Sequence, residues 1–357
     1  MEKTKIRLVS RSFDAGIGGI GKYAGDVFDV LSKSRKFDVD VCELKYNPKV
    51  YVFAPSLMKI PRDDRINIGF NVFEDSMKSI DIAIVHDLIP LTHYYLDGVS
   101  GLKRLERMIV SRAFYKAVRK IIKSQMEGRK YLIFDSSLTE MSYGLLLLGE
   151  ILEKVVDSVD AGETAEELER EIENMALDSS IIHPFVYRRV PKHEFSGIKT
   201  IGMLGRNDSY KGYGLFEKIV ESSRNLRGLV AGPGHKKRKV GRVEYLGFVD
   251  DLEKDFWSRI DALVFTSKIE GFGLPIIEAF SRKIPVYIRP EADIDDELAR
   301  FCHLISERDM TLEEADERKV ADALEFAKSH TRERLEKGFE NAVRGFLKLK
   351  ENEKRKV

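Results

Sequence analysis

An apolar strand pattern, a glycine turn and a helical pattern follow one another between residues 262 and 280. Residues 262–267 form a short run that is typical of a buried strand. Gly271 and Gly273 lie in the turn, where a backbone without side chains can approach a ligand closely. Pro275 suits the first turn of the helix, because its missing N–H would have no partner there. A strand that leads through a turn into a helix is the repeating unit of α/β proteins, which is the fold class we expect.

Two glutamates flank this turn. Glu270 precedes it and Glu278 lies on the first turns of the expected helix, with seven residues between them. A helix N-terminus presents N–H groups without partners and a partial positive charge, which favours an anion or sugar hydroxyls. Two carboxylates so placed can hold two hydroxyl-bearing parts of one ligand. On spacing alone, a plain strand–turn–helix junction with two surface glutamates is an equally good interpretation.

The whole stretch favours the first interpretation. Residues 270–279, Glu-Gly-Phe-Gly-Leu-Pro-Ile-Ile-Glu-Ala, resemble the donor-site motif of retaining glycosyltransferases of the GT-B fold, especially the GT4 family. The resemblance implies that Glu270 faces the donor sugar and that Glu278 binds the ribose. It also implies donor contacts from the turn itself, namely Gly271, Phe272, Gly273 and Leu274. The fold that it implies has two Rossmann-like domains whose parallel sheets face each other across a cleft.

A second group of residues follows the expected strand at 200–204. Gly205 and Arg206 come directly after it, and Lys211 follows five residues later. Taken alone, these are two solvated cations on a turn. The resemblance implies instead that both clamp the donor diphosphate, with Arg206 able to grip two oxygens at once. In the same family the segment that lines the nucleotide base corresponds to Gly247, Phe248 and Val249.

A polar pair ends the apolar strand expected at residues 80–85. His86 and Asp87 follow it, at the end of a parallel strand where α/β proteins place ligands. A lone histidine in this position is more often satisfied by its neighbours. The context Val-His-Asp-Leu-Ile-Pro resembles the same family, which implies that His86 contacts the donor sugar. Asp87 then either orients the imidazole or caps the turn.

Glycines near the N-terminus offer an alternative function. Gly16, Gly18 and Gly21 match the dinucleotide fingerprint, as in an NAD-dependent oxidoreductase. The fingerprint normally starts at the strand end, and here residues 11–15 intervene, which makes the loop too long for the tight turn. The resemblance implies that the loop instead offers backbone N–H groups near the donor phosphates and the acceptor, from Gly18, Gly19 and Gly21.

Residues 101–123 predict a basic amphipathic helix. Its apolar positions recur every four residues, at Leu105, Ile109, Ala113, Ala117 and Ile121. Eight cations surround them: Lys103, Arg104, Arg107, Arg112, Lys116, Arg119, Lys120 and Lys123. Such a helix is either a solvated face or lies on an anionic membrane surface.

Composition limits the protein class. The 357 residues suffice for two cores, and the net charge of +1 gives no field that would attract nucleic acid. Cys42 and Cys302 are far apart in sequence, which suggests a reducing compartment without disulfides. The first residues lack the apolar core of a signal peptide, and the leucine run at 145–148 is too short to span a bilayer. We therefore expect a cytoplasmic protein that touches a membrane at most peripherally.

The resemblance also sets the expected domains. Residues 1–187 would form the acceptor domain, 188–199 a linker and 200–335 the donor domain, and a helix at 336–357 would cross back to the first domain. The acidic stretch at 150–178 departs from the family pattern and leaves the acceptor side open.

The expected function is retaining transfer of a sugar from a UDP- or GDP-sugar to a hydroxyl of a glycan, lipid or small-molecule acceptor. No Asp-x-Asp pair lies at a plausible place, so we expect neither a metal nor another cofactor. Two alternatives remain open: a GT-B sugar-nucleotide epimerase and, more weakly, the NAD-dependent oxidoreductase. The sequence does not identify the base, the sugar, the acceptor or the oligomeric state.

Overall fold

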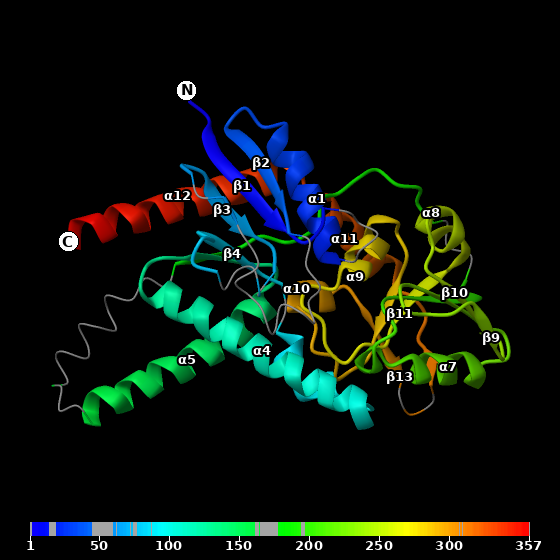
Figure 1. The fold of residues 1–357 in the computed structure, drawn as a ribbon. Helices are drawn as coiled ribbons and strands as arrows, with labels where there is room; N and C mark the ends of the chain where they lie inside the picture. The colour runs from blue at the N-terminus through cyan, green and yellow to red at the C-terminus, as the bar shows by residue number, and fades with distance from the viewer. Residues whose placement is uncertain are drawn as a thin grey trace. The chain divides into compact units, whose positions relative to one another are not determined.

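The chain divides into two compact units, each of which is described by itself (Figure 1). The first contains residues 1–91, 105–184 and 332–357, and the second contains residues 92–104 and 185–331. The computed structural model describes residues 2–13, 19–44, 60–61, 63–71, 73, 77–86, 88–160, 164, 178–193, 197–306, 308 and 310–356. Beyond residue 160, most of the acidic stretch at 150–178 is not among the described residues. Gly16, Gly18 and Asp87 also lie outside them.

The first unit contains a parallel sheet with strand order β2-β1-β3-β4-β5-β6. The strands are β1 (Thr4–Ser10), β2 (Phe37–Glu43), β3 (Ile66–Gly69), β4 (Ile82–Val85), β5 (Tyr131–Phe134) and β6 (Ser179–Ile181). β6 has three residues and ends at Ile181. Pro184 follows closely and has no N–H to give to a ladder, which limits the strand to residues before it.

Four long helices belong to this unit wholly or in part: α1 (Gly19–Ser32), α4 (Gly101–Met126), α5 (Ser137–Asp160) and α12 (Arg332–Lys356). The apolar stripe expected on α4 is wrong over its first half. Leu105 and Ile109 are 54% and 41% exposed, whereas Ala117 and Ile121 are buried. Positions four residues apart advance by about 40° around a helix, so five of them in series cannot all face one core.

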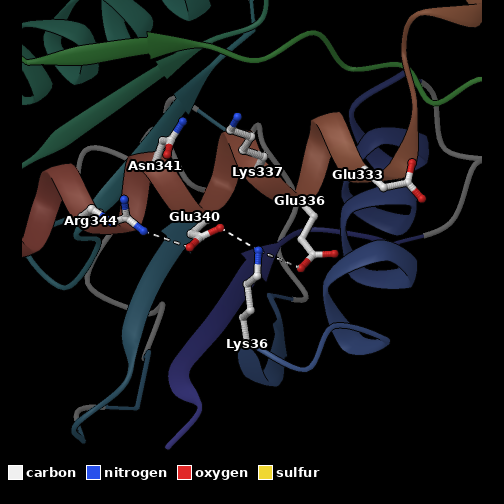
Figure 2. A pocket seen from close by; sticks show the side chains of 7 residues that line it. All are labelled: Lys36, Glu333, Glu336, Lys337, Glu340, Asn341 and Arg344. Carbon is white, nitrogen blue, oxygen red and sulfur yellow. Dashed lines mark hydrogen bonds and ion pairs between the residues drawn. The ribbon is translucent and has the colours of Figure 1, made fainter. Parts of the chain in front are cut away.

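The C-terminal helix α12 packs on β5 and β6 of the first unit. Gly338 and Gly345 are two turns apart and lie on one side of the helix, against Ile182 and the ring of Tyr131. A Cβ atom on Gly345 would lie 2.4 Å from that ring, so this close approach requires glycine. On its other side, α12 lines a charged hollow in which Lys36 contacts Glu340 at 2.7 Å and Glu336 at 3.6 Å (Figure 2).

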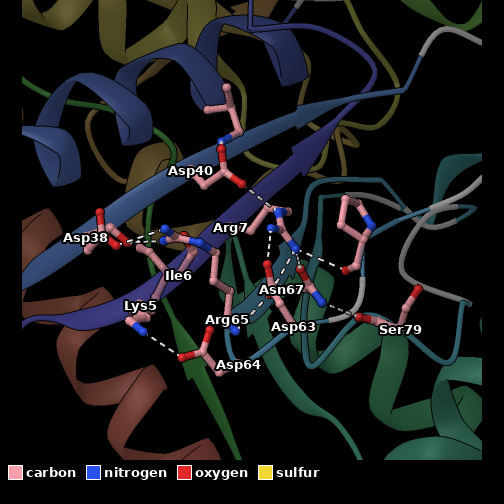
Figure 3. A network of polar contacts seen from close by, with 12 residues as sticks. Lys5, Ile6, Arg7, Asp38, Asp40, Asp63, Asp64, Arg65, Asn67 and Ser79 are labelled. Atoms are coloured by element: carbon pink, nitrogen blue, oxygen red, sulfur yellow. Dashed lines mark hydrogen bonds and ion pairs between the residues drawn. The ribbon is translucent and has the colours of Figure 1, made fainter.

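A buried arginine on β1 links β2 to residues that precede β3 (Figure 3). Arg7 of β1 is only 4% exposed and donates to Asp40 at 2.8 Å and to Asp63 at 2.6 Å. It also donates to the carbonyl of Pro61 at 3.0 Å. A buried guanidinium is tolerated because its donors are satisfied, and these bonds tie Pro61 and Asp63 to the sheet.

The second unit has a sheet with strand order β14-β13-β12-β11-β7-β8-β10-β9. Its strands are β7 (Thr200–Leu204), β8 (Arg227–Ala231), β9 (Arg238–Val240), β10 (Val243–Gly247), β11 (Ala262–Phe265), β12 (Val286–Ile288), β13 (His303–Ser306) and β14 (Thr311–Leu312). The pairs of β9 with β10 and of β13 with β14 are antiparallel, and the pairs between them are parallel. Strand order therefore reverses between β7 and β11, the position at which open α/β sheets bind ligands.

Helices cover this second sheet. They are α7 (Tyr213–Ser222), α8 (Leu252–Asp255), α9 (Leu274–Ser281), α10 (Asp296–Ala299) and α11 (Glu317–Lys328), with short 3₁₀ turns at Ser209–Lys211 (η5) and Trp257–Arg259 (η6). Two apolar clusters form the core, one around Phe280 and one around Phe216. In the described part of the chain, no helix is both long enough and apolar enough to cross a membrane.

Candidate active site

Two loops leave the carboxyl ends of β7 and β11, where strand order reverses. The first carries Gly205, Arg206 and Lys211, and the second carries Glu270 and the glycine turn that opens α9. Because β7 and β11 are paired parallel neighbours, the ends of both strands lie at the same edge of the sheet. The fold of the second unit thus gathers the residues that the sequence predicted from two separate motifs.

Lys211 and Glu270 form an ion pair at this edge. Their side chains are only 10% and 12% exposed. The ammonium of Lys211 also lies 5.4 Å and 5.6 Å from the ring centres of Tyr210 and Phe265. The interpretation of Lys211 as a solvated cation is therefore wrong: its charge is buried and matched by one carboxylate. A buried pair of this kind is sensitive to the loss of either partner.

The backbone around Lys211 is fixed by β11. The hydroxyl of Thr266 donates to the carbonyl of Lys211 at 2.8 Å, and the N–H of Lys268 donates to the carbonyl of Tyr210 at 2.9 Å. Gly212 adopts a left-handed conformation with φ of 76°, and a Cβ atom there would lie 2.4 Å from the carbonyl oxygen of Thr266. Only glycine fits this position, so the Lys-Gly pair of the sequence has a structural cause.

Arg206 differs from Lys211 in its surroundings. Its side chain is 68% exposed, and its Nε lies 3.6 Å from a carboxylate oxygen of Asp208. The hydroxyl of Tyr213 lies 2.9 Å from the carbonyls of both Gly205 and Arg206, which anchors the loop from α7. Burial, followed by the charge of Glu270, raises the pKa of Tyr213, so this hydroxyl stays protonated and able to donate. Arg206 therefore has a fixed backbone and an exposed side chain.

The segment expected to line the base lies next to this loop. The N–H of Gly232, which follows β8, donates to the carbonyl of Gly247 at 2.9 Å, and the N–H of Gly205 donates to the carbonyl of Ala231 at 3.0 Å. Phe248, the next residue, is 51% exposed, which is unusual for so large an apolar side chain. An exposed aromatic ring beside a backbone cradle offers a flat surface on which a base can stack.

The glycine turn opens α9 as expected, with Pro275 in its first turn. Phe272 is only 3% exposed and belongs to the core cluster around Phe280, so its ring does not face a ligand. The predicted donor contact of Phe272 would therefore come from its backbone and not from its ring. Glu278 is half-buried on the second turn of α9, and its carbonyl accepts from Arg282 at 2.8 Å. Gly271 and Leu274 are half-buried at the start of the same helix.

His235 was not predicted from the sequence, although it lies beside the predicted loop. Its ring lies 4.5 Å from that of Tyr213 and 5.5 Å from that of Tyr245. Burial lowers the pKa of His235, so the neutral imidazole is favoured. Its place directly after the Gly-Pro-Gly that follows β8 is the signal that could have identified it, because strand ends in such sheets carry the site.

In the first unit, His86 follows β4 and is 9% exposed. Its Nδ1 lies 3.5 Å from a carboxylate oxygen of Asp135, a residue that the sequence analysis did not single out. Gly19 and Gly21 lie in the first turn of α1, whose leading N–H groups have no partner within the helix. Gly18, the third glycine of this predicted group, lies outside the described residues.

Chemically, the second unit offers two cations, two carboxylates and a helix N-terminus at one sheet edge. Such a set suits a ligand that carries both negative charge and hydroxyl groups. Within the ranges that the structure describes, no three His, Cys, Asp or Glu side chains lie together in a way that could hold a metal ion.

Comparison with known proteins agrees with this arrangement. Residues 198–325, which carry the site of the second unit, match the family described as "Glycosyl transferases group 1". A stretch of 40 residues is 50% identical to the serotype-specific mannosyltransferase WbdA of Escherichia coli. That stretch is 11% of this chain, and it spans only 5% of the length of this curated relative.

Two solved structures share the fold. The chain resembles WaaG, a glycosyltransferase involved in lipopolysaccharide biosynthesis, with a TM-score of 0.52, 14% identity and coverage of 94% of each chain. It resembles sucrose-phosphate synthase from Thermosynechococcus elongatus with a TM-score of 0.53, 14% identity and coverage of 99% of each chain. These likenesses confirm the predicted GT-B fold class.

Proposed function

We propose that the protein is a retaining glycosyltransferase that moves a sugar from a nucleoside-diphosphate sugar, with uracil or guanine as the base, to a hydroxyl group of an acceptor. The observation that carries the proposal is the buried pair of Lys211 and Glu270 at the start of the glycine turn, within the segment that matches the transferase family. The donor would bind at the carboxyl ends of β7 and β11.

The charges of the site suit this donor. The diphosphate would accept hydrogen bonds from Arg206 and from Lys211, and Glu270 would then exchange part of its pairing with Lys211 for a sugar hydroxyl. Glu278 would accept from the ribose, and Phe248 would stack on the base.

Charge stabilisation of the leaving diphosphate would supply most of the rate acceleration. Fixed cations and helix N–H groups that are aimed at developing negative charge need no rearrangement during the reaction. No metal would be required, because the two cations and the N-terminus of α9 neutralise the phosphates. His86 would contact the donor sugar, and Gly18, Gly19 and Gly21 would approach the phosphates.

Membrane contact is a further part of the proposal. Both α4 and α5 carry large apolar side chains that are exposed. On α5 they form one stripe, in which each side chain is more than half exposed: Met141, Leu145, Leu148 and Leu152. The two helices are tied together, since Arg119 of α4 pairs with Glu150 and Glu153 of α5. Exposed cations on α4 flank the apolar side chains: Arg112, Lys116, Lys120 and Lys123. Apolar side chains beside cations suit a cytoplasmic leaflet rich in anionic lipid.

The two alternatives are less well supported. An NAD-dependent oxidoreductase would use the glycines at 16–21, whereas the family match lies in residues 198–325. A sugar-nucleotide epimerase would share the donor site, and the similar proteins described above are named as transferases or a synthase.

Thermal unfolding with a panel of UDP-, GDP- and ADP-sugars tests donor binding. A ligand at 100 times its Kd stabilises the native state by about 2.7 kcal/mol, which should raise the midpoint by on the order of 5 °C. A rise with one nucleotide and none with NAD supports the proposal. A rise with NAD alone contradicts it.

Product analysis then separates transfer from epimerisation. With the donor that binds, transfer to an added acceptor should give a product that keeps the anomeric configuration of the donor, as read by proton NMR. An inverted product would contradict retention, and an epimerised nucleotide sugar without transfer would support the alternative. Undiminished transfer in excess chelator is the expected result if no metal takes part.

A further inference from the structure

His86 and Asp135 follow two neighbouring strands. Strands β4 and β5 are parallel, and Val85 is paired in register with Phe134. The residue that directly follows each strand therefore lies at the same height, at the carboxyl edge of the sheet where ligands bind. His86 and Asp135 are these residues, and the register makes them neighbours although 49 positions separate them in the sequence.

The surroundings hold the imidazole in one orientation. The ring of Tyr23 packs edge-on against that of His86, with centres 5.3 Å apart and planes at 86°. The hydroxyl of Thr139 donates to the backbone carbonyl of His86 at 3.3 Å. On the remaining side, Nδ1 of His86 faces Asp135 at 3.5 Å. The carboxylate is 4% exposed, so water competes little for it.

The other ring nitrogen has a different environment. Nε2 of His86 is buried and has no hydrogen-bond partner among the residues that the structure describes. A buried polar atom without a partner is uncommon and marks a group that a ligand can satisfy. The histidine thus has one nitrogen that faces a carboxylate and one that is available.

We propose that Asp135 is a positioning residue for His86. Its carboxylate keeps the ring proton on Nδ1, so Nε2 presents a lone pair that accepts a hydrogen bond from a hydroxyl of the donor sugar. Which nitrogen carries the proton is set by the partner of the other one, and an Nδ1 partner fixes Nε2 as the acceptor. The role of the sugar hydroxyl rests on the proposed function, whereas the contact of Asp135 with His86 does not. The separation of 3.5 Å is long for a hydrogen bond, and we expect it to shorten when donor binds, as catalytic contacts do.

Nitrogen NMR of the full chain tests the positioning contact directly. With histidine rings labelled with ¹⁵N, the signal of His86 is assigned by its loss in His86→Gln. We expect an Nδ1 shift of the protonated type and an Nε2 shift of the unprotonated type near neutral pH. The wild-type spectrum decides this point, and the variant serves only to assign the signal. A proton on Nε2 would overturn the proposal.

Variants then connect the tautomer with turnover. Asp135→Asn should redistribute the proton between the nitrogens and lower kcat by about tenfold to a hundredfold, the range seen when a metal-ligating histidine loses the carboxylate that orients it. Binding of the bare nucleoside diphosphate should not change. Asp81→Asn is the matched control, because it removes a carboxylate from the other end of β4, where Asp81 accepts from the N–H of Asn67 at 2.9 Å. It should leave both the spectrum and kcat unchanged.

Two further results would contradict the proposal: an unchanged His86 spectrum in Asp135→Asn, or full turnover in His86→Gln. If no nucleoside-diphosphate sugar is turned over by the wild-type protein, the proposed function fails. The spectrum would still decide whether Asp135 sets the tautomer.

Discussion

At the scale of single residues, Arg206 and Lys211 carry the same charge in opposite environments. Lys211→Ala would leave Glu270 buried without its cation, and breaking a buried pair from one side costs about 3–5 kcal/mol. Arg206→Ala should change stability by less than about 1 kcal/mol, because its side chain is exposed. Both variants should lose on the order of a hundredfold in turnover. Urea unfolding measures the first effect, and equal midpoints for the two variants would contradict the buried pair.

A double variant separates charge from packing in the same pair. Lys211→Met combined with Glu270→Gln removes both charges and keeps similar volumes, so it should recover most of the stability that Lys211→Ala loses. It should not recover turnover. Recovery of turnover would show that neither charge takes part in the chemistry.

The two glutamates of the motif should have separable effects. Glu278→Ala should weaken binding of the bare nucleoside diphosphate by roughly 1–3 kcal/mol, because a hydrogen bond between ribose and a charged group is lost. Glu270→Gln should keep that binding or strengthen it, since it frees the ammonium of Lys211 for the diphosphate, while turnover falls. Calorimetric titration measures both, and the reverse pattern would mean that the two roles are exchanged.

At the scale of elements, Gly212 joins η5 to α7 and sets the position of Lys211. Gly212→Ala should destabilise the protein by at least about 1–2 kcal/mol, the penalty for a left-handed alanine, before the clash with Thr266 is added. Gly214→Ala is the control, because it lies in α7 with no atom within 4 Å of an added Cβ and should be neutral or stabilising. If both variants lowered the unfolding midpoint equally, the left-handed conformation and the close contact with Thr266 would not explain the need for glycine at position 212.

The paired helices α4 and α5 predict a specific pattern of vesicle binding. Sedimentation with anionic vesicles should weaken as salt rises, and each cation removed from α4, as in Lys116→Gln, should cost about 1 kcal/mol. Leu145→Gln and Leu148→Gln should weaken binding at all salt concentrations, because the apolar face is lost. As a control, removal of the cations at 236–239 of the second unit should leave vesicle binding unchanged. Equal binding to neutral and anionic vesicles would mean that the cations of α4 face solvent and do not contact lipid.

Much of each sheet could be predicted from the sequence, because buried parallel strands are short apolar runs with turn residues after them. β7 was predicted to the residue. β3 was missed, since its four residues include Asn67 and Gly69 and give a weak pattern. α5 was missed, although Met141, Leu145, Leu148 and Leu152 recur at the spacing of one helix face.

The site could be predicted as two motifs but not as a pair. Spacing along the chain does not show that Lys211 and Glu270 touch, since that contact depends on β7 and β11 being sheet neighbours. Asp135 was missed for the same reason, because its significance comes from strand register with His86. The roles of the predicted residues remain predictions that the experiments above address.

At the scale of the whole molecule, the first unit is built from both ends of the chain. Arg332 of α12 donates to Asp29 of α1 at 2.8 Å, and the helix covers β5 and β6. A chain that ends at residue 331 should therefore lose hydrogen-exchange protection in β5 and β6 and keep it in β7, β8 and β11. A chain that ends at residue 350 should behave like the full chain. Native protection of β5 after removal of α12 would contradict this dependence.

The close contact of α12 with Tyr131 and Ile182 also has a consequence during synthesis on the ribosome. The strands that receive this helix are translated long before it, and residues 185–331, the larger part of the second unit, are made in between. Domains generally fold as units while the chain emerges, at about 5–20 residues per second. The second unit can thus finish folding first, whereas the earlier sheet keeps an apolar face uncovered until translation ends. During those seconds a chaperone that shields Tyr131 and Ile182 would bind the nascent chain and leave when α12 docks.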